Sequence, residues 1–328
     1  MIDRDEQSWR KLEPAKVAFL KWRTQHHRFK HAVNEIRKTH EMSGVEGRGM
    51  LLMGVAGLGK SSILASYYKH HLAGRKDLES PERSKEPIIF VSVPAEPTLK
   101  TLIQEILLAS SYEGSIKGTV GELKQKLDEL IRARGVELLI FDEFQHFLRE
   151  QAKSNTRGVV NHIKPMMDKH KLAVIMAGVP AGYRSIARYE EPHQRFAQRE
   201  TRLEPFQIDS EEDLKAFGSY LNACTGFLKR QEVKVVPLAS KEMIVRVYVA
   251  TKGIPRLIAR LIEMALDEAD PGETITNNDL ARAFTKTSMN LELKNFNPFN
   301  ARYERVFDRA AQAAKEAAME NKKNWDIR

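Results

Sequence analysis

Up to about residue 208, short apolar runs alternate along the chain with longer segments in which apolar residues recur every three or four positions. The runs lie at 50–53, 88–93, 138–141 and 172–177. Runs of this length predict strands buried on both faces, and the segments at 62–71, 98–110, 119–134 and near 157–170 predict helices. The alternation therefore predicts an α/β fold with a doubly wound parallel sheet.

The segments on either side of this region have only the helical pattern. Residues 1–47 predict an N-terminal helical arm, with ten basic against five acidic residues between 1 and 40. Residues 209–285 predict a small helical lid, and 286–328 an Ala-rich extension with few large apolar residues, either a partner-binding segment or a solvated helix. The predicted domains are thus 1–47, 48–208, 209–285 and 286–328.

A glycine-rich segment follows the first apolar run and matches the P-loop pattern G-x-x-x-x-G-K-[ST]. Such a loop curls its backbone N–H groups around a phosphate at a helix N-terminus, although a chance lysine in a Gly-rich turn is the alternative. Lys60 is expected to reach the β- and γ-phosphates of ATP, and Ser61 to bind Mg²⁺. The expected nucleotide contacts are Gly54, Val55, Ala56, Gly57, Leu58, Gly59, Lys60, Ser61 and Ser62.

Two acidic residues follow the third apolar run, in the segment "VELLIFDEFQHF". Asp142 comes at the carboxyl end of the predicted strand, where ligands of open α/β sheets bind, and is the expected second partner of Mg²⁺. Glu143 is the expected general base that orients and deprotonates the attacking water. A solvated acidic turn is the alternative, and the P-loop makes hydrolysis the stronger interpretation.

Composition narrows the class of protein. One cysteine, Cys224, excludes a disulfide framework, and the ten histidines form no grouping with metal-ligand spacing along the chain. No apolar run is long enough for a membrane span, so we expect a cytoplasmic protein. The 53 basic and 44 acidic residues give a net charge of +9, which favours nucleic acid as a further partner over membrane, with a solvated basic surface as the alternative.

Four segments together resemble the core and lid of an AAA+ ATPase. They are the P-loop, "LLIFDE", "PHQRFAQRETRLEPF" and "GIPRLIARLIEMA", in that order. The resemblance implies that Arg195 is an arginine finger acting on the nucleotide of a neighbouring subunit, with Arg199, Arg202 and Arg188 as rivals. It also implies that Arg256 reports the γ-phosphate from the lid.

This resemblance has one departure. The strand at 172–177 runs into Ala-Gly-Val, whereas many AAA+ proteins carry a polar residue there that helps to align the attacking water. The sequence does not identify what replaces that residue.

The segments "VPAEPTLKTLIQEIL", "KGTVGELKQKL" and "VELLIFDEFQHF" are more specific and resemble the TnsC/TniB group of transposition regulators over about residues 45–285. The resemblance implies homo-oligomeric rings or filaments on double-stranded DNA, which connect a TniQ-like target selector to a transposase of the TnsA/TnsB kind. A member from a CRISPR-associated transposon would fit the short length and the basic arm. Hydrolysis of ATP would control assembly.

The same resemblance places DNA contacts near two predicted helix starts. Lys100 and Lys117 would bind backbone phosphates, and Thr98 and Thr119 would either bind DNA or cap the helices. Two other functions stay open. One is an AAA+ replication initiator or helicase loader, and the other is a signalling NTPase with protein partners only.

Overall fold

The computed structural model describes residues 14–22, 24–73, 85–94, 98–110, 112–148, 153–181, 199–270, 272–294 and 296–326. The chain forms two compact units. Unit 1 comprises the residues up to His26 and Pro205–Met319, and unit 2 comprises His27–Glu204 and the residues from Glu320. Each unit has its own apolar core.

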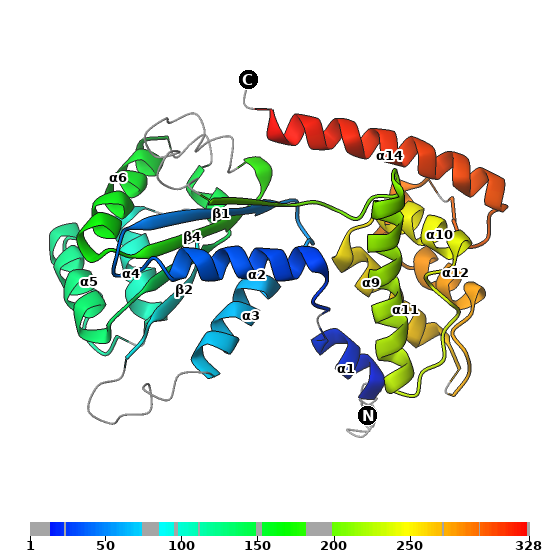
Figure 1. Cartoon of the computed structure of the whole chain (residues 1–328), viewed down its shortest axis with the longest axis horizontal. Coiled ribbons are helices and arrows are strands. Elements are labelled where there is room, and N and C mark those ends of the chain that lie inside the picture. Colours follow the sequence, from blue (N-terminus) through cyan, green and yellow to red (C-terminus); the bar gives the residue numbers. More distant parts are fainter. Residues whose placement is uncertain are drawn as a thin grey trace, which may run out of the picture. The chain divides into compact units, whose positions relative to one another are not determined.

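Unit 2 is built on a five-stranded parallel sheet in the order β2-β3-β4-β1-β5 (Figure 1). The strands are β1 (Arg48–Gly54), β2 (Ile88–Ser92), β3 (Leu138–Asp142), β4 (Ala173–Gly178) and β5 (Arg199–Leu203). Every residue of β3 and β4 is buried, because both faces of the central strands are covered. Four of these strands confirm the apolar runs of the sequence.

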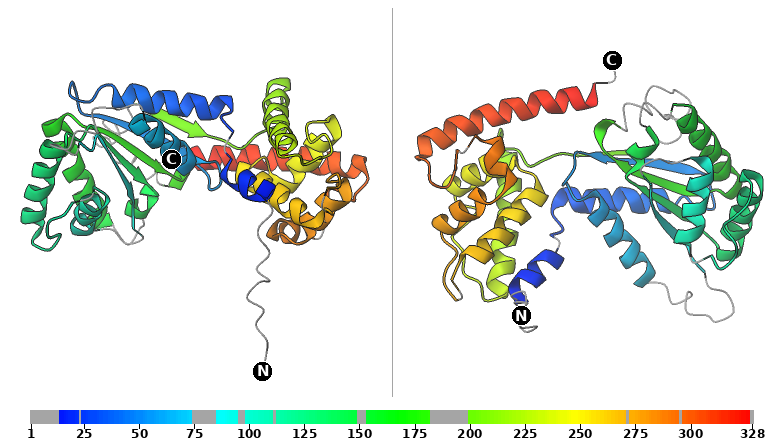
Figure 2. Two further views of the ribbon diagram at one scale, coloured as in Figure 1. Left: turned by 90° about the horizontal axis from the view of Figure 1, so that it is seen from below. Right: turned by 180° about the vertical axis from the view of Figure 1, so that it is seen from behind.

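Helices cover both faces of this sheet (Figure 2). Leu51, Ile89, Phe141 and Val174 point to one face and share a core with α4 (Leu99–Ala109), α5 (Val120–Arg134) and α6 (Lys153–His170). On the other side, α2 (His27–His40) and α3 (Lys60–Ala73) contact β1 and β4. A short 3₁₀ helix, η2 (Phe144–Leu148), follows β3. The doubly wound sheet predicted from the sequence is confirmed.

Strand β5 was not predicted. Its sequence, Arg-Glu-Thr-Arg-Leu, contains one large apolar residue, and only Thr201 and Leu203 are buried. A strand at the edge of a sheet can be buried on one face only, so its other residues can stay polar. Such a strand lacks the unbroken apolar run by which the other four were predicted. The arginine-rich segment of the sequence therefore ends inside the sheet.

Unit 1 is helical throughout its described regular structure. It contains α1 (Pro14–Lys21), α9 (Glu211–Arg230), α10 (Lys241–Thr251), α11 (Pro255–Glu268), α12 (Asn277–Thr285), α13 (Ser288–Glu292) and most of α14 (Tyr303–Trp325). Phe217, Tyr248 and Phe284 are at its centre. Cys224 is buried here, and burial raises the pKa of its thiol to about 12, which fits a structural cysteine.

The two ends of the chain contribute to both units. Phe19 of α1 and the neighbouring Trp22 pack on Phe227 of α9 in unit 1, whereas α2 packs on the sheet of unit 2. The predicted arm at 1–47 therefore supplies a helix to each unit. Helix α14 buries Val306 in unit 1, and its last residues, from Glu320, belong to unit 2.

No helix of the described residues is both long enough and apolar enough to cross a membrane.

Candidate nucleotide-binding and catalytic site

The backbone between β1 and α3 turns through glycines. Gly57 and Gly59 each have a φ of 89°, in the left-handed region that favours glycine. A Cβ atom at Gly54 would lie 2.7 Å from the carbonyl oxygen of Leu203, so β5 can run beside β1 only if this residue is glycine. The P-loop pattern is therefore explained by backbone conformation and by close packing of two strands.

Lys60 begins α3 and is buried, with 7% of its surface exposed. Its Nζ donates hydrogen bonds to the carbonyl oxygens of Gly54 (2.7 Å) and Val55 (3.0 Å). These bonds hold the ammonium along its own loop, where a phosphate could take the place of the carbonyls at little cost. The residue before the helix, Gly59, has no side chain to cap the first N–H groups of α3, so those groups can face an anion.

Asp142 and Glu143 lie at the same edge of the sheet. Because β1, β4 and β3 are neighbouring parallel strands, the carboxyl end of β4 lies between the P-loop and Asp142. Asp142 is 6% exposed, and its Oδ1 accepts the backbone N–H of Glu143 (2.9 Å). Glu143 has a φ of 57°, which is strained for a residue with a side chain and turns the chain sharply after Asp142.

Gln145 completes this edge and was missed by the sequence analysis. Its Nε2 donates a hydrogen bond to Oε2 of Glu143, and its Oε1 accepts the backbone N–H of Val179 (3.2 Å) after β4. The amide therefore connects the acidic turn after β3 to the end of β4. The only hint in the sequence was a glutamine two residues after the Asp-Glu pair, which does not reveal its distant partner.

The candidate finger arginines differ in what the structure describes of them. Arg195 and Arg188 lie outside the described residues. Arg199, in β5, donates from Nη1 to Oε2 of Glu35 on α2 (2.8 Å), and hydrogen bonds from Lys38 and then from Arg199 hold the pKa of Glu35 below its usual value. Arg199 would have to leave this ion pair to reach another subunit.

Two further arginines can be placed within their units. The guanidinium of Arg202 lies 4.6 Å from the ring centroid of Trp325 and pairs with Glu200, so it too is held within unit 2. Arg256 is the second residue of α11 and is exposed in unit 1. It follows a turn in which Gly253 has a φ of 66° and packs on the carbonyl of Phe206. The roles of the finger and of Arg256 stay predictions.

The two threonines near the predicted DNA contacts cap their helices. Thr98 accepts the N–H of Thr101 (3.1 Å) at the start of α4, and Thr119 accepts the N–H of Glu122 (3.3 Å) at the start of α5. Each forms a reciprocal capping box. The capping interpretation is therefore confirmed for both, and a DNA contact by either stays a prediction.

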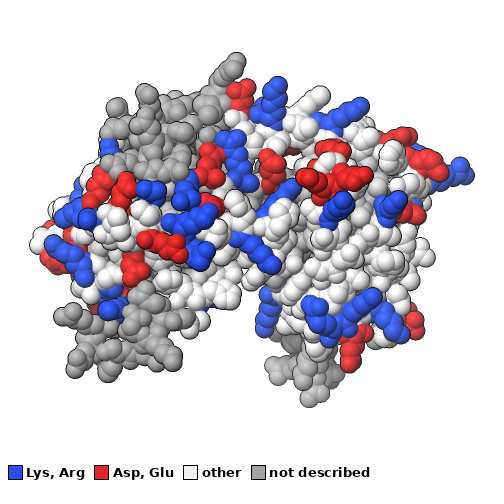
Figure 3. Space-filling view, in the orientation of Figure 1, with Lys and Arg blue, Asp and Glu red and all other residues white. Residues whose placement is uncertain are grey.

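Lys100 and Lys117 are exposed beside these caps. Helices α4 and α5 pack against each other. Hydrogen bonds from Thr119 and, less strongly, the charges of Lys126 and Lys100 hold the pKa of Glu122 in α5 below its usual value. Lys126 supports the intervening loop by donating to the carbonyls of Ser115 (2.8 Å) and Lys117 (3.0 Å). On the face shown in Figure 3, basic and acidic side chains are interspersed, so the net charge by itself does not identify a DNA-binding surface.

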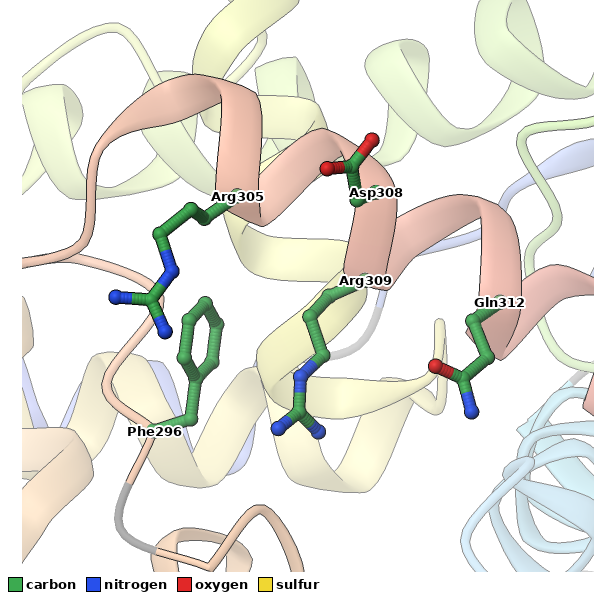
Figure 4. Close-up of a pocket in the computed structure, with 5 residues that line it drawn as sticks. All are labelled: Phe296, Arg305, Asp308, Arg309 and Gln312. Atoms are coloured by element: carbon green, nitrogen blue, oxygen red, sulfur yellow. The ribbon is translucent and has the colours of Figure 1, made fainter.

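A pocket of about 240 Å³ lies on α14 in unit 1, whereas the P-loop belongs to unit 2 (Figure 4). The guanidinium groups of Arg305 and Arg309 lie 5.8 and 4.9 Å from the ring centroid of Phe296, and Asp308 and Gln312 line the rest. Its residues Arg305 and Asp308 lie near the start of α14, but the pocket has no glycine-rich turn and pairs its arginines with the ring of Phe296. The P-loop edge is therefore the better nucleotide site.

The sequence matches the family described as "Bacterial TniB protein" over residues 17–207. No curated protein matches the chain. Among solved structures, it is similar to Cdc6p from Pyrobaculum aerophilum (TM-score 0.59, 12% identity, covering 82% of this chain and 70% of that chain). It is also similar to the ORC2 protein of Aeropyrum pernix (TM-score 0.59, 16% identity, covering 84% of this chain and 74% of that chain). A third similar structure is Drosophila ORC bound to DNA (TM-score 0.53, 13% identity, covering 93% of this chain and 77% of that chain). These structures show that the fold is that of a P-loop AAA+ ATPase.

Proposed function

Because the chain belongs to the bacterial TniB protein family, we propose that it is an ATP-dependent regulator of DNA transposition. ATP-bound subunits assemble as rings or filaments on double-stranded DNA and connect a TniQ-like target selector to a TnsA/TnsB-like transposase. Hydrolysis of ATP limits the assembly. The observation that carries the proposal is the convergence of the P-loop, Asp142 and Glu143 at one edge of the sheet.

The residues at this edge fit ATP with Mg²⁺. The helix start after Gly59 offers N–H groups to the phosphates, and the buried ammonium of Lys60 adds a positive charge. The hydroxyl of Ser61 and the buried carboxylate of Asp142 are the oxygen donors that Mg²⁺ prefers. When bound, Mg²⁺ neutralises charge on the β- and γ-phosphates.

Glu143 is proposed as the general base. Its carboxylate would accept a proton from the attacking water, while Lys60 binds the phosphates and an arginine from a neighbouring subunit offsets the developing charge. The short connections after β1 and β3 support this assignment, because they leave Lys60 and Glu143 at the same edge of the sheet.

Binding to DNA is proposed to occur through the backbone. Lys100 and Lys117 are exposed next to two helix starts, and phosphate contacts of this kind carry no sequence information. A regulator that accepts many target sites needs such contacts. Similarity in fold to Drosophila ORC bound to DNA leaves an origin-binding ATPase as the second candidate, to be distinguished by sequence-specific binding without ATP.

The test is Glu143→Gln. We expect turnover of ATP to fall about 10²- to 10⁴-fold, the usual contribution of a general base, while ATP binding persists and assemblies on DNA accumulate. Turnover is measured by phosphate release and assembly by electron microscopy. Glu129→Gln, at an exposed position of α5, is the matched control and should behave as wild type. Wild-type turnover in Glu143→Gln would exclude the assignment.

A further inference from the structure

The side chain of Gln145 lies between two elements of the candidate catalytic edge. It donates to the carboxylate of Glu143 in the turn after β3 and accepts the N–H of Val179 after β4. A primary amide can do both at once, since it carries a donor and an acceptor at opposite ends. No other neutral side chain of this length offers that pair of groups.

The end of β4 is shaped to receive this amide. A Cβ atom at Gly178 would lie 2.8 Å from Oε1 of Gln145, so the glutamine packs directly on the glycine. Ala177, Gly178 and Val179 offer no polar side chain of their own. The amide of Gln145 thus supplies a polar group at the end of β4, which has none of its own. It lies between β4 and the turn that contains Glu143.

From this geometry we propose that Gln145 is a positioning residue for hydrolysis, which fixes the Glu143 carboxylate relative to β4. This inference rests on the proposed ATPase function. The strained turn sets the backbone of Glu143, and Gln145 restrains its side chain, so that the base is oriented before the nucleotide binds. The loss of the amide would leave Glu143 with many orientations.

Two variants separate positioning from a merely structural role. Gln145→Met removes both hydrogen bonds at similar volume, and Gln145→Glu keeps an acceptor for Val179 but loses the donor to Glu143. We expect both to lower kcat about 10- to 100-fold, with the Kd for ATP within about twofold of wild type. If the bond to Val179 alone mattered, Gln145→Glu would retain wild-type kcat, and the proposal would be wrong.

A double-mutant cycle completes the test. If Gln145 acts through Glu143, adding Gln145→Met to Glu143→Gln should cause no further loss of turnover. Losses that multiply would assign Gln145 to another role. Wild-type turnover in Glu143→Gln would instead contradict the proposed function, so the two failures are distinguishable.

A second inference comes from the opposite end of β3. His40 at the end of α2, His71 in the last turn of α3 and Glu137 just before β3 offer ligand atoms that all lie within 4.8 Å of one another. Nε2 of His40 lies 3.2 Å from Oε2 of Glu137. The three residues are far apart in the sequence, so the spacing of histidines along the chain could not reveal this grouping.

His40 is oriented as metal-binding histidines usually are. It is 4% exposed, and its Nδ1 is hydrogen-bonded to the hydroxyl of Tyr67 (2.8 Å), so that Nε2 faces Glu137. A partner on the second ring nitrogen fixes the ring and its tautomer. The ring of His71 lies 4.7 Å from that of His40, between centroids.

We infer that His40, His71 and Glu137 bind one Zn²⁺ ion. Two imidazoles and a carboxylate suit this ion, which would need ligand atoms about 3.4 Å apart at usual bond lengths. His71 and Glu137 are only partly buried and can rotate to close that distance. The ion would fasten α2 and α3 to the start of β3, at the end of the sheet remote from Asp142.

The test is Zn²⁺ binding by the chelator-treated full chain, measured by competition with a chromophoric chelator. We expect one Zn²⁺ per chain in the wild type, and an affinity at least about tenfold lower in His71→Gln and Glu137→Gln. His70→Gln, at the exposed neighbouring position of α3, is the matched control and should keep the wild-type affinity. Equal, weak binding by all four proteins would mean an adventitious ion only and would overturn the inference.

Discussion

Two kinds of helix start occur at the sites proposed to bind anions. Helix α3 begins after Gly59, which has no capping side chain, and its first residue is a buried lysine. Helices α4 and α5 begin after Thr98 and Thr119, whose side chains already accept an N–H from the first turn. The first helix start has no side chain at the capping position, an arrangement suited to an anion, whereas the second uses a side chain to stabilise the helix.

This difference determines how each site can bind. At α3 the backbone and Lys60 together can enclose a phosphate, so a single substitution should abolish binding. At α4 and α5 a phosphate would have to use Lys100 and Lys117, which are exposed and screened by salt. Each lysine should therefore contribute little by itself, and binding should depend on many subunits.

The largest effect is expected from Lys60→Ala. Loss of the buried ammonium removes the contact to the β- and γ-phosphates, and we expect ATP binding to become undetectable and assembly on DNA to fail. Binding is measured by titration with a fluorescent ATP analogue. Lys69→Ala, at an exposed position of α3, is the matched control. Near-normal binding in Lys60→Ala would remove the functional distinction between the two kinds of helix start.

Features that depend on one short segment could be predicted from the sequence, whereas features that depend on contacts between distant segments could not. The P-loop pattern could be recognised in the sequence because its glycines and lysine lie in one short segment, although the individual nucleotide contacts stay predictions. The buried strands could be predicted because their apolar runs are unbroken. The proposed role of Gln145, by contrast, depends on its hydrogen bond to Val179, which joins the segment after β3 to the segment after β4. No local pattern contains that information.

Two further features depend on tertiary packing. Strand β5 has a polar sequence with one large apolar residue, which its position at the edge of the sheet permits. His40, His71 and Glu137 meet only because α2 and α3 pack on the same side of the sheet. Pairing and packing of distant segments, rather than propensity, decide both features.

The next effect concerns the arginine finger. Arg195→Ala should lower turnover about 10³-fold or more, and mixing it with Lys60→Ala protein should partly restore activity, because each interface needs one intact site and one intact finger. Arg199→Ala serves as the comparison. Since Arg199 is paired with Glu35 within its own chain, we expect its loss to affect stability more than turnover. If turnover were restored by mixing Lys60→Ala protein with Arg199→Ala but not with Arg195→Ala, Arg199 would be the arginine finger.

A smaller effect is expected at the capped helix starts. Lys100→Ala and Lys117→Ala should each weaken ATP-dependent DNA binding alike for all sequences. Each should also lower the slope of log K against log salt by about 0.9 for every DNA phosphate that the substituted subunit no longer neutralises. Binding is followed by fluorescence anisotropy at several salt concentrations, with ATP binding as the control. Strong sequence preference, or tight binding without ATP, would favour the initiator function.

The smallest effect, and the one of opposite sign, is expected from Glu122→Gln. Glu122 stands at the start of α5, where its carboxylate accepts the N–H of Thr119 (2.7 Å) and experiences the positive charges of Lys126 and Lys100. Backbone and side-chain hydrogen bonds from Thr119 hold the pKa of Glu122 below its usual value, so at neutral pH its negative charge opposes a phosphate at this place. Glutamine can keep the capping box without that charge.

We therefore expect Glu122→Gln to strengthen DNA binding about two- to fivefold at low salt, the range of exposed charge interactions. The advantage should shrink at high salt because screening weakens such interactions, and it should vanish when the pH falls below the depressed pKa of Glu122, where the wild-type carboxyl is also neutral. Glu129→Gln, farther along α5, removes the same charge and should change little. If both substitutions strengthened binding equally, the effect would reflect net charge alone, and the capped helix starts would lose their assignment as the DNA-binding site.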